Sequence, residues 1–104
     1  MTDYSVLSDR EIDRLVLNIV YGRHANDKDV QRCWSRGGFK YTNNPDEAWP
    51  IIVENKIDIN WGDDVHHALK GAVIASKGKL SATHSNPLRA TMIVFLQMQE
   101  NNHD

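Results

Sequence analysis

Apolar residues near the start of the chain recur every three or four positions, which is the spacing of one face of an α-helix. The residues that follow this spacing are Ile12, Leu15, Val16, Ile19 and Val20. Ser8 stands where a helix N-cap is expected, and Glu11, three residues later, completes the pattern of a capping box. Gly22 suits the position that ends a helix. The pattern therefore predicts a helix over residues 8–21.

The next segment has a weaker pattern. Residues 23–29 are polar throughout and predict a loop. Apolar and polar positions then alternate imperfectly over residues 30–35, which predicts a short strand. Two glycines at 37–38 predict a turn, and residues 39–41 follow as a short extended piece with both aromatic side chains on one side.

A second helix is predicted where Asn44 offers a cap, Pro45 fits the first helical position and Glu47 closes a capping box. Pro50 interrupts this pattern, because a proline inside a helix removes one backbone hydrogen bond and costs about 3 kcal/mol. We therefore expect either a kink near Trp49 or a helix that begins at Pro50. The three apolar residues after Pro50 supply core in either case.

Three strands are predicted in the following third of the chain. Residues 56–61 alternate cleanly between polar and apolar positions and are typical of a half-buried strand. A polar turn at 62–64 precedes a second strand over residues 66–75. A turn at 76–78 then leads to a third strand over residues 79–83.

The last helix is predicted to open at Ser85 or Asn86, with Pro87 in the first helical position. Its middle, residues 92–96, is apolar almost all round, so other elements must cover it on more than one side. This helix would also suit the seam of a homo-oligomer. The polar tail over residues 99–104 is expected to fray.

These elements predict a single α+β domain over residues 1–104, in the order α-β-α-β-β-β-α. Three helices pack on a small, mainly antiparallel sheet in this prediction. A chain of 104 residues with 40% hydrophobic and 25% charged residues has the composition of one globular domain.

Charge and cysteine content restrict the function classes. The formal net charge of -2 argues against a general binder of polyanions. Cys33 is the only cysteine of the sequence, which suits a reducing cytoplasm. No signal peptide is evident at the N-terminus, and the longest apolar run, residues 92–96, is too short to span a bilayer. We expect a soluble protein of a bacterial cytoplasm that does not interact with membrane.

Three stretches of the sequence carry a family resemblance. They are Asp3-Tyr4-Ser5 with Leu7-Ser8-Asp9, Asn43-Asn44-Pro45 with residues 48–55, and Asn86-Pro87-Leu88-Arg89-Ala90 with residues 92–96. With these stretches the chain resembles the small NinX-type proteins of lambdoid bacteriophages and related prophages. The resemblance implies a phage accessory protein from an early region, with no established biochemical function and no catalytic residues to carry over. The element order and Trp49 also resemble a small phage domain built as a three-layer α/β/α sandwich, which is the alternative architecture.

Two groups of residues could carry enzyme chemistry. Asp63, Asp64, His66 and His67 are of the types that bind zinc, but two adjacent histidines on a strand point to opposite faces, so a polar turn is the simpler interpretation. Cys33 lacks a base that the sequence places beside it, so it is not predicted to be a nucleophile. We predict no catalytic residue, no metal and no cofactor, and keep a metal-dependent enzyme only as the third hypothesis.

Nucleic-acid binding is the second hypothesis. Basic residues are interleaved with aromatic ones between residues 23 and 41, which is the combination that proteins use to follow phosphates and stack bases. The basic residues are Arg23, Lys28, Arg32, Arg36 and Lys40. The alternative interpretation is a solvated loop whose aromatic residues anchor it to the core.

Binding to an unidentified host or phage protein is the leading hypothesis. Three tryptophans are many for so short a chain, and an exposed tryptophan is a common hot spot of protein interfaces. The surface is predicted around the start of the second helix and the aromatic segment before it, with Trp34, Phe39, Tyr41, Asn43, Asn44 and Trp49. Each tryptophan also fits a place in the core, since Trp49 shares helical spacing with Ile52 and Val53, and Trp61 shares a strand face with Ile59.

Overall fold

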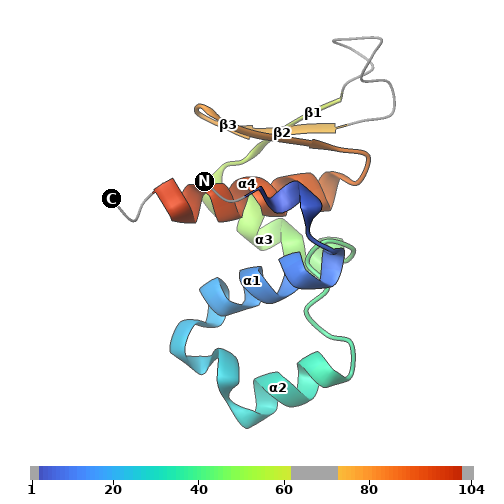
Figure 1. Cartoon of the computed structure of the whole chain (residues 1–104), viewed down its shortest axis with the longest axis vertical. Helices are drawn as coiled ribbons and strands as arrows, with labels where there is room; N and C mark the ends of the chain where they lie inside the picture. Colours follow the sequence, from blue (N-terminus) through green and yellow to red (C-terminus); the bar gives the residue numbers. More distant parts are fainter. Residues whose placement is uncertain (1–2, 62–72, 102–104) are drawn as a thin grey trace.

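The computed structural model describes residues 3–61 and 73–101 of the chain, which form four α-helices, two 3-10 turns and a three-stranded sheet (Figure 1). In chain order the elements are η1 (Tyr4–Val6), α1 (Asp9–Tyr21), η2 (Gly22–Asn26), α2 (Lys28–Ser35), α3 (Pro45–Asn55), β1 (Asp58–Trp61), β2 (Val73–Lys77), β3 (Leu80–His84) and α4 (Pro87–Asn101). The α+β class predicted from the sequence is confirmed.

The elements form layers that begin with the sheet. Helix α4 packs against β2 and β3, and α1 and α3 pack against α4 on its side away from the sheet. Helix α2 lies farthest from the sheet (Figure 1). All the described helices therefore lie on one side of the sheet, and for this part of the chain the three-layer α/β/α alternative is wrong.

The strands pair as β1-β2-β3 and both pairs are antiparallel, as predicted. Ile59, Ala75 and Ala82 stand opposite one another and belong to the apolar core, whereas Asp58, Ser76 and Ser81 share the other face. Strand β1 starts later than predicted because Lys56, with φ of 53°, ends α3 in the left-handed conformation.

The hairpin between β2 and β3 is shifted from its predicted place. Strand β2 continues to Lys77, and the turn is made by Gly78 and Lys79. Gly78 has φ of 61°, a conformation that glycine adopts without the steric penalty of a side chain. The part of the second predicted strand before residue 73 lies outside the described residues.

Helix α1 begins and ends where the sequence predicts. The Ser8 hydroxyl accepts a hydrogen bond from the Glu11 amide at 3.1 Å and lies 3.1 Å from the Glu11 carboxylate. Its buried face differs from the predicted stripe. Ile12, Val16 and Leu17 are fully buried, whereas Leu15, Ile19 and Val20 remain at the surface.

Helix α2 replaces the strand predicted over residues 30–35, and the turn η2 replaces the loop before it. Val30 and Trp34, one helical turn apart, pack against the core from one side of α2. The same two residues also fit a period of two, so the local pattern did not separate helix from strand. No residue of α2 is fully buried.

Helix α3 runs from Pro45 to Asn55 with Pro50 inside it, so the prediction of a helix that begins at Pro50 is wrong. Asn44 caps the helix, with its side-chain oxygen 3.0 Å from the amide of Asp46. The Glu47 carboxylate accepts a hydrogen bond from the Asn44 side chain at 3.0 Å, whereas the Asn44 amide donates to the Lys40 carbonyl, so the two residues pair but not as the predicted capping box. These contacts stabilise the first turn, where Pro50 removes the hydrogen bond to the Asp46 carbonyl.

Helix α4 is the most buried helix, as predicted. Its cap is Asn86, whose side-chain oxygen accepts the amide of Leu88 at 2.9 Å. Every residue over 90–96 is buried, because β2 and β3 cover one side of the helix and α1 and α3 cover the other. The middle of α4 therefore offers no exposed apolar surface for a homo-oligomer seam. The helix continues to Asn101, into the tail that was expected to fray.

Candidate functional site

The three stretches that carry the family resemblance meet where α1, α3 and α4 begin. Arg89 of α4 is only 5% exposed and donates from one terminal nitrogen to the Asp9 carboxylate at 2.7 Å. Its other terminal nitrogen donates to the carbonyls of Ser5 at 3.1 Å and Leu7 at 2.6 Å. One buried guanidinium therefore holds the N-terminal segment against α4.

The segment before α3 joins the same junction. The Asn86 side chain donates to the Thr42 carbonyl at 2.6 Å, and the Thr42 amide donates to the buried Asp13 carboxylate at 2.9 Å. The exposed Asn43 side chain lies 3.4 Å from the Asp9 carboxylate. Most polar groups of this junction are bonded to one another, Arg89 Nε being without a partner among the described residues, so we interpret it as an architectural element.

Asp13 is a buried carboxylate within this junction, with 2% of its surface exposed. Burial raises its pKa above the ordinary value, although the Thr42 hydrogen bonds and the charge of Arg10 act in the opposite direction. The Arg10 guanidinium lies 3.7 Å from this carboxylate. Asp13 connects α1 to the segment before α3.

Trp34 anchors α2 to α1. The guanidinium of Arg10 lies over the indole ring, with its central carbon 3.4 Å from the ring centroid. Arg10 also donates to the carbonyls of Trp34 at 2.8 Å and Gly38 at 3.0 Å. This predicted partner-binding residue is therefore engaged inside the molecule, and the contact fixes where the segment after α2 emerges.

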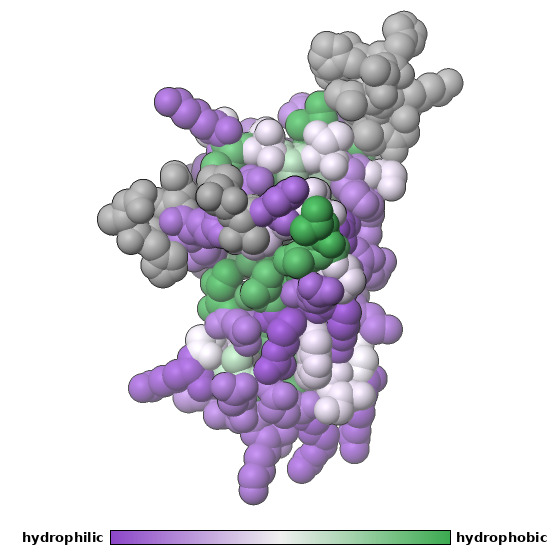
Figure 2. Space-filling view, in the orientation of Figure 1, coloured by the Kyte–Doolittle hydropathy of each residue, from purple (hydrophilic) through white to green (hydrophobic). Residues whose placement is uncertain are grey.

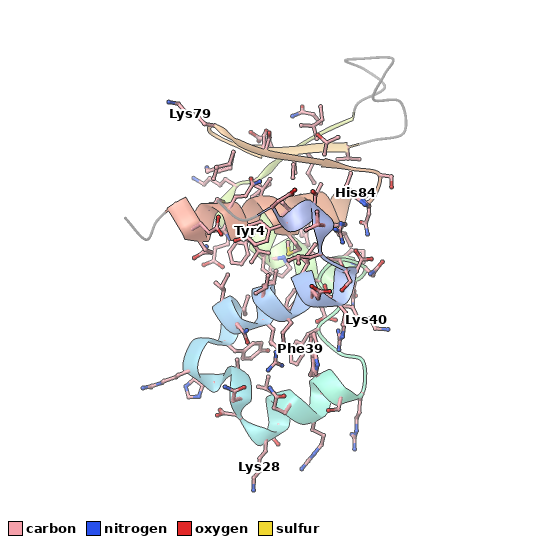
Figure 3. The ribbon with its side chains drawn as sticks, in the orientation of Figure 1. Tyr4, Lys28, Phe39, Lys40, Lys79 and His84 are labelled. Atoms are coloured by element: carbon pink, nitrogen blue, oxygen red, sulfur yellow. The ribbon has the colours of Figure 1, made fainter. Side chains whose placement is uncertain are left out.

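That segment brings Phe39 between two tyrosines. Its ring meets Tyr21 edge to face at 5.3 Å and stacks on Tyr41 at 6.3 Å between centroids. Figure 3 shows Phe39 between α1 and α2. Tyr41 is buried, and this burial, together with nearby Tyr21 and Glu47, raises its pKa, so its hydroxyl stays neutral.

These aromatic residues line a hollow between α1 and α3 of about 480 Å³, which we call the aromatic hollow. Its lining residues are Ile19, Val20, Tyr21, Phe39, Tyr41, Glu47, Pro50, Ile51, Glu54, Asn55 and Phe95. Two of them, Glu47 and Glu54, carry charge, and both are acidic. Among the described residues, Glu54 has neither a salt bridge nor a hydrogen bond from its side chain.

Both helices that border the aromatic hollow carry exposed apolar residues. On α3, Trp49 is 56% and Val53 is 55% exposed, and neither lines the hollow, whereas the exposed Pro50 does. On α1, Ile19 and Val20 are also exposed. We call these five exposed residues the apolar rim, of which Ile19, Val20 and Pro50 line the hollow. The core placement considered for Trp49 is wrong, because this side chain is at the surface.

The exposed apolar surface continues along α1. A second hollow of about 450 Å³ lies between η1, α1 and the end of α4, and Leu15 and Ile19 line it. Figure 2 shows a band of apolar side chains across the molecule in the region of η1, α1 and α4. The last turn of α1 extends past the core, so its apolar residues have no described neighbour that covers them fully.

The predicted basic residues are all exposed, and three of the five share one hollow. Arg32, Arg36 and Lys40 line a third hollow of about 530 Å³ beside Cys33 and Asp29. Lys28 points away from the body of the molecule (Figure 3). The stacked aromatic residues line a different hollow, and among the described residues Glu47 alone lines both.

Cys33 is exposed and forms no disulfide. Within residues 3–61 and 73–101, no group of three or more histidine, cysteine, aspartate or glutamate residues is placed to hold a metal ion. The metal site considered over residues 63–67 lies outside this part of the chain. None of the described helices is both long and apolar enough to cross a membrane.

Ile19, Val20, Val53 and Glu54 are not among the site residues predicted from the sequence. One feature of the sequence does indicate the residues of α1: the first helix carries more apolar residues than a single helix face can bury. Of the predicted residues Phe39, Tyr41 and Trp49, the first two line the aromatic hollow and the third is exposed on α3 outside its lining. Asn44 caps α3 instead.

The fold and the surface define a small α+β protein whose described helices lie on one side of the sheet and carry exposed apolar residues. The chain belongs to the bacteriophage P22 NinX family, whose model matches residues 3–99. This match confirms the resemblance found in the sequence. No curated protein and no solved structure shows significant similarity to the chain.

Proposed function

We propose that this chain is a non-enzymatic phage accessory protein that binds another protein, of the host or of the phage, in the bacterial cytoplasm. Its membership of the NinX family supports the phage accessory role. The apolar rim supports the binding role, because large apolar residues that stay exposed at the surface are characteristic of interaction surfaces.

The single observation that carries this proposal is the exposure of Trp49. Its side chain is 56% exposed on a helix whose other face supplies core. A tryptophan buries a large area on association and is among the residues most enriched at interface hot spots. Val53, one turn later on α3, extends the same surface.

The experiment is affinity purification of the tagged protein from infected bacteria, with wild type compared with Trp49→Ala and Val53→Ala. Val6→Ala is the matched control for Val53→Ala, because Val6 is 77% exposed on η1 and lies outside the apolar rim. We expect one near-stoichiometric protein that survives nuclease treatment, is lost from the rim variants and is retained by the control. Equal recovery by all four proteins would contradict the proposal.

Folding of the rim variants is checked by thermal unfolding. Trp49 and Val53 are exposed, so each alanine variant should change the free energy of unfolding by less than about 0.5 kcal/mol. Loss of a partner without loss of stability then reports on binding alone. A variant that unfolds early would instead indicate that the residue is needed for the fold.

Nucleic-acid binding is the second candidate, favoured by the hollow that Arg32, Arg36 and Lys40 share. Anisotropy with a labelled single-stranded oligonucleotide tests it. Phosphate binding releases counterions and weakens steeply as salt rises, whereas a contact centred on Trp49 does not. Absence of binding at low salt would remove this candidate.

A further inference from the structure

We propose that the aromatic hollow receives an arginine or lysine side chain of the partner protein, so that the partner segment is apolar and basic. This inference rests on the proposed function and adds the chemistry of the partner. Three properties of the hollow support it: its aromatic wall, the sign of its charges and its aliphatic entrance.

The aromatic wall suits a cation. Phe39 contacts both Tyr21 and Tyr41, all three line the hollow, and the face of an aromatic ring attracts a positive charge through its quadrupole. Phe39 has φ of 60°, which is an outlier for a bulky residue. Such backbone strain persists only where surrounding contacts hold it, and it is common at binding sites. Arg10 supplies one such contact by donating to the Gly38 carbonyl.

The charges of the hollow are of one sign. Glu47 and Glu54 line it, and the described lining includes no lysine, arginine or histidine. Glu47 already accepts hydrogen bonds from Asn44 and from the Lys40 amide. Glu54 has no such partner in the described part of the chain, so it is the carboxylate available to a ligand. A concave surface with low-dielectric walls and one sign of charge concentrates the opposite charge.

The entrance of the hollow suits the rest of such a side chain. Lysine and arginine carry an apolar stem below the charged head and lay that stem along apolar surface. Ile19, Val20 and Pro50 line the hollow beside its aromatic wall and provide this surface. An acidic segment would meet like charge at Glu54, and a purely apolar side chain would leave the carboxylates without a counter-charge.

The first test measures binding of small probes by NMR. The folded protein is titrated with N-acetyl-arginine methylamide and, at matched ionic strength, with the neutral N-acetyl-norleucine methylamide. We expect the arginine probe to shift resonances of Tyr21, Phe39 and Glu54 and to bind more tightly than the norleucine probe. Glu54→Gln should weaken the arginine probe by about two- to fivefold, the range of solvent-exposed ion pairs.

Asp58→Asn is the matched control, since it removes the same charge from an exposed position on β1 outside the hollow. It should leave the affinity of the arginine probe unchanged. Equal binding of both probes, or equal effects of Glu54→Gln and Asp58→Asn, would overturn the inference. Resonance shifts confined to other parts of the protein would also overturn it.

The second test separates this inference from the proposed function. The partner is captured with Glu54→Lys and Asp58→Lys beside Trp49→Ala. Loss of the partner from Glu54→Lys and Trp49→Ala, with retention by Asp58→Lys, supports both ideas. Loss from Trp49→Ala alone refutes the cationic ligand and keeps the protein-binding function. Retention by all three variants contradicts both.

Discussion

The guanidinium of Arg89 on α4 lies 2.7 Å from the carboxylate of Asp9 at the start of α1, and this contact joins two ends of the sequence. The same guanidinium satisfies two carbonyl oxygens of the segment that leads into α1. Because a buried cation needs several partners to offset its lost hydration, the contact specifies one placement of the N-terminal segment.

Replacement of Arg89 should destabilise the fold. Arg89→Ala removes a buried cation and leaves the carbonyls of Ser5 and Leu7 without their donor, so we expect a loss of about 2–4 kcal/mol in the free energy of unfolding. Arg89→Lys should lose less stability than Arg89→Ala, because the lysine ammonium keeps the positive charge. It should still be less stable than wild type, because it lacks the planar fork of donors of the guanidinium. Urea unfolding measures both variants. A loss below about 0.5 kcal/mol for Arg89→Ala would show that the junction is dispensable.

The buried carboxylate of Asp13 should make stability fall as pH rises. Its pKa is raised in the folded state, so between the ordinary value of 3.8 and the raised value the folded protein binds more protons than the unfolded chain. Stability from this group is therefore greatest below 3.8 and is lost as pH rises through the folded pKa. Asp13→Asn does not titrate, so its stability relative to wild type should increase from pH 3 to pH 7. A difference independent of pH would refute this assignment.

Gly38 should resist substitution because it passes close to α2. An added Cβ would overlap the Cys33 sulfur and would lie 3.0 Å from the Cys33 carbonyl oxygen. We expect Gly38→Ala to cost about 1–3 kcal/mol, the range for overpacking. Cys33→Ala should recover part of this cost in the double variant, because it removes the sulfur and leaves the backbone contact. Additive effects of the two substitutions in urea unfolding would argue against a direct overlap.

The contact of Arg10 with Trp34 should control the docking of α2. No residue of α2 is fully buried, so few other contacts hold this helix. In Arg10→Ala we expect hydrogen exchange to accelerate in the amides of residues 28–35 more than in those of α4. Arg36→Ala is the control, since Arg36 is exposed on the C-terminal side of α2. Equal acceleration in both helices would indicate global destabilisation instead of local undocking.

Part of the fold could be predicted from the sequence because some signals are local. The caps of α1, α3 and α4 bind amides two or three residues away, so their positions follow from the neighbouring sequence. Helix α2 could not be separated from a strand in this way. Its placement depends on the contact of Trp34 with Arg10. These two residues are 24 positions apart in the sequence, so a local pattern does not reveal the contact.

The candidate site was predictable only in part. The aromatic segment and Trp49 are predicted interaction residues; Phe39 and Tyr41 line one hollow, and Trp49 is exposed elsewhere on α3. The contribution of α1 was not predicted, because its periodic apolar residues look alike until a neighbour covers some of them. Glu54 becomes a candidate site residue only because Tyr21 and Phe39, which come from other segments, line the same hollow.

The sequence by itself determined where most helices begin, the antiparallel pairing of the strands, the burial of α4 and the family. These properties depend on caps, turns and apolar runs whose partners lie within a few residues. Tertiary structure alone decided that all helices described share one side of the sheet, that Trp49 faces solvent and that the aromatic residues and the cations line different hollows. Burial and shared surface are relations between distant segments, so a local pattern does not contain them.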